Sequence, residues 1–198
     1  MSIRIKLTVL FLVFVSVPSL LISVLTFTNY KNSLEANRLS ELQNIAAFKA
    51  DRIEIFFAGL KANIEVAQGY YNIKKNLPIL NRFAHDPDDA EYRAARQALD
   101  KQLQHIQPLL HLSDIMLVNP QGEVVYSSNL KHMKTDFLHL LPDPRQKAFE
   151  KGGKEIYFSD IFMNKADEDA PGMLITAPVS GSDGAFIGVI AFEVDLNS

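Results

Sequence analysis

The amino-acid sequence predicts an α+β protein in which a transmembrane helix and a long stalk helix lead to an antiparallel sheet of about five strands flanked by helices. Three observations predict this class. Residues 7–30 contain no Asp, Glu, Lys, Arg or His. Residues 31–77 contain no proline and carry apolar residues at helical spacing. From residue 114 onward, short apolar runs alternate with turn residues, a pattern typical of strands.

The first of these segments predicts a transmembrane helix over residues 7–30, because it exceeds the roughly 20 apolar residues that cross a bilayer core. The alternative is a cleaved secretory signal. A signal has an apolar stretch of only about 7 to 15 residues followed by small residues, and the Thr-Phe-Thr-Asn sequence at 26–29 does not supply them. Uncleaved anchoring is therefore the better interpretation.

The charges around this segment predict its orientation. Arg4 and Lys6 precede it, and the first 30 residues contain no acid. The positive-inside rule then places residues 1–6 in the cytoplasm and everything after residue 30 outside it. We expect a bacterial inner (plasma) membrane protein whose remaining residues are periplasmic.

The composition of the outer part excludes some functions. Without Arg4 and Lys6, 18 Lys and Arg stand against 23 Asp and Glu, a net charge of −5. Nucleic-acid-binding domains carry basic stripes, so no nucleic-acid partner is expected. The chain has no cysteine, so the hydrophobic core alone must stabilise the outer domain.

A stalk helix is predicted over residues 31–78, ending at Pro78. Its spacing lies between the straight-helix and coiled-coil periods, so the apolar stripe suits either a globular domain or a partner helix. Gly59 and Gly69 weaken the helix by about 1 kcal/mol each relative to Ala, and they are either sites of close approach or simply tolerated. We expect a homodimer with a seam at Leu39, Leu42 and Ala46. The full stripe comprises Leu39, Leu42, Ala46, Ala50, Ile53, Phe57, Leu60, Ile64, Ala67 and Tyr71.

A separate module is predicted over residues 79–198. It begins with a helix that has an Asp cap and Pro87 in its first turn, within the segment 86–89, and that stops at Pro108. A second, short helix is expected over 142–151, closed by Gly152 and Gly153. We expect both helices on one face of the sheet. The predicted strands are 115–118, 124–126, 155–162, 173–179 and 185–194.

This order of elements and three sequence blocks resemble those of a known family. The blocks are Asp114–Tyr126, Tyr157–Phe162 and Ile175–Ile190. They resemble a Cache domain, the extracytoplasmic PAS-like sensor of bacterial histidine kinases, chemoreceptors and cyclic-dinucleotide enzymes. The ending Phe192–Asn197 resembles the exit from the membrane-distal half of a double Cache sensor. The resemblance implies that residues 79–198 are a sensor module and that the output domain belongs to a longer receptor.

The sequence contains no signature of catalysis, and neither a cofactor nor a metal site is expected. The five histidines lack metal-helix spacing, and the glycines at 181, 184 and 188 do not match a phosphate-binding loop. No Gly-x-Ser-x-Gly motif of a serine hydrolase is present. We expect this chain to be a non-enzymatic part of a receptor.

The resemblance also implies a ligand site between the sheet and the segment at about 130–153. A carboxylate or other small metabolite needs a fixed cation and hydrogen-bond donors in an apolar cavity. Amino-acid-binding members of the family have an Arg followed closely by Trp, whereas this chain has no Trp. Tyr157 and Asp160 are the foremost candidates because they lie in a recognisable block. The full candidate set is Tyr126, His132, Arg145, Lys147, Tyr157, Ser159, Asp160 and Thr176.

Two hypotheses of function follow. In the first, a small molecule binds the sensor module and shifts the stalk helix, which biases a cytoplasmic output domain in a two-component or chemotaxis receptor. In the second, a single-span envelope protein presents a domain that binds another protein, without a small ligand. The second hypothesis predicts a filled core and an exposed apolar patch in place of a ligand site.

Overall fold

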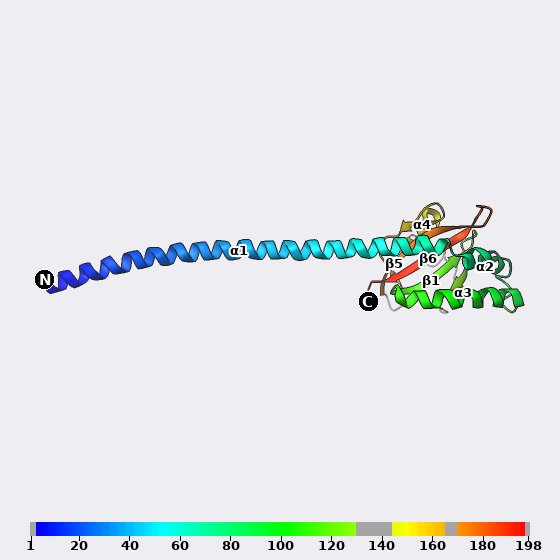
Figure 1. Cartoon of the computed structure of the whole chain (residues 1–198), viewed down its shortest axis with the longest axis horizontal. Helices are drawn as coiled ribbons and strands as arrows, with labels where there is room; N and C mark the ends of the chain where they lie inside the picture. Colours follow the sequence, from blue (N-terminus) through cyan, green and yellow to red (C-terminus); the bar gives the residue numbers. More distant parts are fainter. Residues whose placement is uncertain (1–2, 130–143, 165–169, 197–198) are drawn as a thin grey trace. The chain divides into compact units, whose positions relative to one another are not determined.

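The computed structural model describes residues 3–129, 144–164 and 170–196 (Figure 1). The chain divides into two compact units, residues 1–55 and residues 56–198. Helices α1, α2 and α3 come before strands β1 and β2, then helix α4 and strands β3 to β6. The predicted α+β class is confirmed.

Helix α1 (Ile3–Gln68) contains the predicted membrane segment. By length and composition, it is the one helix within the described residues that is apolar enough to cross a membrane. The hydroxyl of Thr28 donates hydrogen bonds to the carbonyls of Val24 and Leu25, both at 3.0 Å. Such bonding satisfies a polar group inside an apolar segment.

The first unit also contains the predicted dimer seam. The side chains of Leu39 and Leu42 are 59 % and 64 % exposed, and Ala46 is exposed as well. Outside the seam, the guanidinium of Arg52 lies 5.1 Å from the centre of the Phe48 ring. Dimerisation through the seam stays a prediction.

The stalk helix differs from the expectation, because it ends at Gln68 rather than at Pro78. Tyr70 adopts an extended conformation (φ −62°, ψ 128°), and α2 (Tyr71–Arg82) begins after it. Pro78 lies inside α2. Proline costs a helix interior about 3 kcal/mol. The neighbouring Leu77 and Leu80 are fully buried, and each contributes about 1.5 to 3 kcal/mol, which is enough to outweigh that cost.

Helix α3 (Ala90–Leu109) begins with the predicted Asp cap, here Asp89. Its carboxylate accepts hydrogen bonds from the backbone N–H groups of Glu91 at 2.7 Å and Tyr92 at 3.3 Å. These bonds satisfy two of the N–H groups that a helix start leaves without partners. Pro87 precedes the helix instead of lying in its first turn.

The antiparallel sheet has the strand order β2-β1-β6-β5-β3, with β4 also paired to β5. Where one third strand was expected over 155–162, β3 and β4 are separated by residues 159–161. The side chain of Ser159 accepts the backbone N–H of Leu174 at 2.9 Å, which replaces a main-chain acceptor and interrupts the ladder. The strands are β1 (Leu112–Val118), β2 (Val124–Ser127), β3 (Tyr157–Phe158), β4 (Phe162–Asn164), β5 (Ala170–Ser180) and β6 (Phe186–Asp195).

The predicted hairpin between β1 and β2 is present and turns at Asn119. The Asn119 side-chain oxygen accepts the N–H groups of Gln121 at 3.0 Å and Glu123 at 2.8 Å. Its amide donates to Asn81 of α2 at 2.8 Å. Gly122 has a positive φ of 88°, which glycine adopts without steric cost. One side chain therefore closes the turn and attaches it to α2.

Both faces of the sheet are buried, so the expectation of helices on one face is wrong. The end of α1, α2 and α3 cover one face, and α4 (Pro144–Gly152) covers the other (Figure 1). Strand β1 shows the reason. Ile115 and Leu117 belong to the core under α1 to α3, whereas Met116 and Val118 belong to the core under α4. A strand that is apolar on both faces needs a cover on each.

Candidate ligand site on the sheet face under α4

The sheet face under α4 carries two buried carboxylates. Asp114 of β1 pairs in register with Glu193 of β6, and Leu174 of β5 pairs with Glu193 on its other side. Asp114 and Glu193 are 0 % and 1 % exposed. Paired residues of neighbouring strands point to the same face, so the two acids lie side by side in the otherwise apolar layer under α4.

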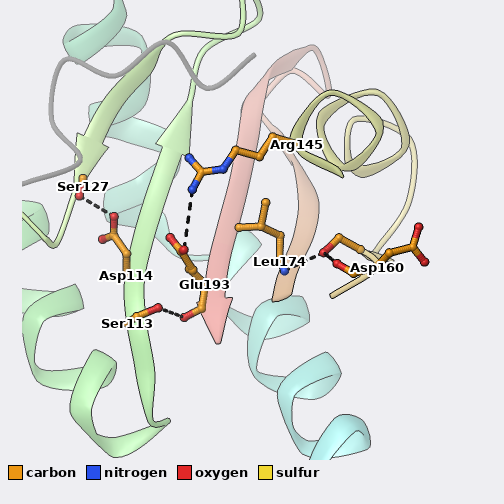
Figure 2. Close-up of polar contacts among 8 residues, drawn as sticks. Ser113, Asp114, Ser127, Arg145, Asp160, Leu174 and Glu193 are labelled. Carbon is orange, nitrogen blue, oxygen red and sulfur yellow. Dashed lines mark hydrogen bonds and ion pairs between the residues drawn. The ribbon is translucent and has the colours of Figure 1, made fainter. Parts of the chain in front are cut away.

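Arg145, in the first turn of α4, points down to this pair (Figure 2). One of its terminal nitrogens lies 3.8 Å from Oε1 of Glu193, and the two side chains are 4 % and 1 % exposed. The guanidinium also lies 5.6 Å from the centre of the Phe162 ring. Burying ions costs several kcal/mol each, so such a pair persists where its members compensate each other.

Asp114 accepts three hydrogen bonds from the end of β2 and the residues after it. Its carboxylate accepts the hydroxyl of Ser127 at 2.7 Å (Figure 2). It also accepts the hydroxyl of Ser128 at 2.8 Å and the backbone N–H of Asn129 at 2.9 Å. These three bonds hold the Asp114 side chain in place within the layer under α4.

The middle and the last turn of α4 contact strand β5 closely. The hydroxyl of Thr176 donates to the carbonyl of Ala148 at 2.8 Å. A methyl group at Gly152 would overlap the side chain of Thr176. Beside this contact, the ammonium of Lys151 lies 4.8 Å from the centre of the Tyr157 ring. Glycine at this position is what allows α4 to lie so near the strand.

The geometry of a sheet with a polar cluster under a short helix invites comparison with known proteins. No protein-family model and no curated protein matches the chain. Solved structures do match. The sensor domain of the Vibrio cholerae histidine kinase DctB is 16 % identical with a TM-score of 0.48, and the match covers 78 % of this chain and 57 % of that one.

Two further structures are similar to the chain. The extracellular domain of a putative histidine kinase, vpHK1S-Z8, is 13 % identical with a TM-score of 0.49 over 71 % of this chain and 52 % of that one. The ligand-binding domain of the Pseudomonas aeruginosa chemoreceptor PctB, in complex with L-Arg, is 15 % identical with a TM-score of 0.41 over 73 % and 54 %. The chain thus spans little more than half of each structure. All three TM-scores lie below 0.5 and all three identities below 25 %.

Asp160, a foremost sequence candidate, lies at the outer edge of this region. Its side chain is 81 % exposed and pairs with the ammonium of Lys147 at 3.2 Å. The Asp160 carboxylate raises the pKa of Lys147 above its usual value. Ser159 is buried, and its hydroxyl donates to the carbonyl of Asp160 at 2.8 Å, so it serves the local backbone.

Tyr126 lies on the opposite face of the sheet, against α3. Its ring is 5.8 Å from the guanidinium of Arg96. Burial, with the nearby carboxylate of Asp100, raises the pKa of the Tyr126 hydroxyl well above its usual value. The Tyr126 hydroxyl and one carboxylate oxygen of Asp100 are both buried. His132 falls outside the described residues.

The structure therefore places Arg145 and Thr176 on the same sheet face, and Tyr126 on the opposite one. Tyr157 lies near Lys147, at the exposed edge with Asp160. In the described ranges, no three His, Asp or Glu side chains are grouped to hold a metal ion.

Sequence reasoning missed Asp114 and Glu193. A usable signal was present, because each is a single acid inside an apolar strand run. Such a residue is expensive to bury unless it has hydrogen-bond or charge partners. A lone charge in a strand that is apolar on both sides therefore indicates a polar site.

Proposed function

We propose that this chain is the membrane-anchored, extracytoplasmic sensing part of a bacterial signalling receptor. The observation that carries the proposal is the buried pair of Arg145 and Glu193, beside Asp114, on the sheet face under α4. Small-molecule sites are mostly apolar with a few convergent polar groups, and this face has that composition. A purely structural role is a weaker explanation, because apolar residues of similar size are often as stable as a buried ion pair.

The proposed ligand is a carboxylate or another small polar metabolite. Arg145 would supply the cation for an anionic group, since a guanidinium binds carboxylates through two parallel hydrogen bonds. Glu193 and Asp114 would bind donor groups of the ligand. Thr176 and Tyr157 would line the site from β5 and β3.

The proposed location follows from the apolar segment of α1. Residues 7–30 would cross the bacterial inner membrane with the N-terminus in the cytoplasm, and the module that follows would be periplasmic. Within that module, Leu60 and Ile64 of α1 are buried in the core on the sheet face opposite α4. A ligand that binds two arrangements of this core unequally would bias the position of α1, and through it an output domain such as a histidine kinase.

The test is thermal unfolding of the full chain in detergent micelles, measured with panels of carboxylates, amino acids, amines and purines. A ligand at a hundred times its dissociation constant adds about 2.7 kcal/mol of stability. Arg145→Gln removes the buried cation, and Asp160→Asn changes an exposed acid near the same helix.

A shift that survives Asp160→Asn and is lost in Arg145→Gln supports the buried site. A shift lost in Asp160→Asn alone moves the site to the outer edge of α4. If no compound in the panels shifts the unfolding temperature, the alternative of an envelope protein that binds another protein gains support.

A further inference from the structure

Strand β1 has one extra residue beside the polar cluster. Leu112 pairs with Val194 and Asp114 pairs with Glu193, so three residues of β1 lie opposite two residues of β6. The extra residue is Ser113. An insertion of this kind is a β-bulge, which interrupts the ladder and changes the direction of the side chains beside it.

The bulge determines which face of the sheet Asp114 occupies. In a regular strand, residues two apart point to the same face, so Asp114 would share the face of Leu112. That face is the core under α1 to α3, to which Leu112 and Ile115 both belong although they are three residues apart. Because of the extra residue, Asp114 instead shares the face of Met116, under α4. An acid that pointed the other way would be buried in the larger apolar core.

Two side chains hold the bulge. The side-chain amide of Gln107, in the last turn of α3, donates to the carbonyl of Ser113 at 2.9 Å. The hydroxyl of Ser113 donates to the carbonyl of Glu193 at 3.1 Å (Figure 2). A bulge leaves backbone groups without partners in the ladder, and such groups need other partners when they are buried. The amide of Gln107 supplies one for the carbonyl of Ser113.

Ser113 is therefore joined to both acids of the cluster. Its peptide group leads directly into Asp114, and its hydroxyl bonds to the main chain of Glu193. Gln107 reaches it from α3, which packs on the face opposite α4. A contact made on one side of the sheet thus acts on the placement of side chains on the other side.

We propose that this bulge is the positioning device of the candidate ligand site, with Gln107 and Ser113 as its positioning residues. Both act through Asp114 and Glu193. Functional side chains must be held within about 0.5 Å of their working geometry, which requires supporting hydrogen bonds of this kind. The use of the bulge in ligand binding rests on the proposed function, whereas its effect on the two acids does not.

The test is NMR of the full chain in detergent micelles without any ligand, with the carboxyl carbons of Asp and Glu labelled. Gln107→Met keeps a side chain of similar length and removes the donor to Ser113. We expect the carboxyl signals of Asp114 and Glu193 to shift, while the signal of the exposed Asp160 stays in place. Urea unfolding of the same variant measures its stability separately.

A second variant and a control accompany Gln107→Met. Ser113→Ala removes the hydroxyl that bonds to the Glu193 carbonyl, and it should shift the same two carboxyl signals. Gln104→Met is the matched control, because Gln104 is an exposed glutamine three residues earlier in α3. It should leave all of these signals unchanged.

A lower urea midpoint with unmoved carboxyl signals in Gln107→Met and Ser113→Ala would mean that the bulge only stabilises the fold, and the proposal would be overturned. Unmoved signals at an unchanged midpoint would overturn it as well. If Gln107→Met does not fold, Ser113→Ala is judged by the same pattern. Since these measurements need no ligand, a failed bulge with a ligand-dependent unfolding shift leaves the proposed function standing, and the reverse result leaves the positioning of the acids standing.

Discussion

Asp114 and Glu193 occupy directly opposite positions on the neighbouring strands β1 and β6, and both are buried. Like charges directly opposite each other destabilise a sheet. Here each acid has its own compensation, because Asp114 accepts bonds from Ser127, Ser128 and Asn129, while Glu193 lies beside Arg145. The two strands thus hold a polar cluster at the centre of an apolar face, and the first turn of α4 completes it.

The contribution of Arg145 to the stability of the protein can be measured by unfolding, without a ligand. Arg145→Met leaves Glu193 buried without this cation, and removing one partner of a buried pair costs about 3 to 5 kcal/mol. The double variant Arg145→Met with Glu193→Leu should recover most of that loss, because it buries no unpaired charge. Urea unfolding measures both. A double variant no more stable than the single one would mean that the two side chains do not stabilise each other.

Alanine substitutions at two glycines, Gly152 of α4 and Gly59 of α1, together test the packing of α4 on the sheet. Gly152→Ala places a methyl group against Thr176 and should destabilise the module by about 1 to 3 kcal/mol, the usual cost of overpacking. At Gly59 of α1 nothing lies within 4 Å of an added methyl group, and the residue is inside a helix. Gly59→Ala should therefore stabilise the protein by about 1 kcal/mol. Thermal unfolding should move in opposite directions for the two variants, and parallel shifts would contradict the packing of α4.

The raised pKa of Tyr126 predicts that the folded protein loses stability at alkaline pH. Its pKa is raised above the usual 10.0 in the folded state, chiefly by burial and then by Asp100. Below pH 10 the hydroxyl is neutral in both states. As the pH rises further, the unfolded chain releases this proton and the folded chain keeps it, so the free energy of unfolding falls by up to about 1.4 kcal/mol per pH unit.

Tyr126→Phe should remove this part of the pH dependence. The stability difference between the two proteins, taken from urea midpoints at pH 8 and pH 11, should change in favour of the variant at the higher pH. Tyr71→Phe, at a position 73 % exposed, is the matched control. An unchanged difference for Tyr126→Phe would show that the hydroxyl ionises as easily in the folded protein as in the unfolded chain.

The dimer seam on α1 is tested by Leu42→Asp. If Leu39, Leu42 and Ala46 face the same residues of a second copy, a carboxylate at the centre of the seam must be buried beside its equivalent, which opposes association. Sedimentation of the full chain in detergent should show a shift from dimer toward monomer. Asp51→Asn, a polar change on the same helix, controls for altered charge, and an unchanged profile for Leu42→Asp would count against this seam.

Several features of the fold follow from short stretches of sequence. The apolar run at 7–30, the Asp89 cap and the turn at Asn119 and Gly122 depend on composition or on bonds between residues a few positions apart. Such local preferences act in any chain that contains them, so they predict the apolar helix, the start of α3 and the first hairpin.

Other features depend on residues far apart in the chain. The helix break at Gly69 and Tyr70 follows from the way the buried faces of α1 and α2 pack on the same sheet. The second cover of the sheet and its polar cluster depend on strand register, which brings Asp114 beside Glu193 and places α4 with Arg145 over both. Hydrophobic periodicity identifies an apolar face but does not specify which element covers it, because burial is non-directional. Of the three charged residues, sequence reasoning named only Arg145, and the packing of β1, β6 and α4 joined it to Asp114 and Glu193.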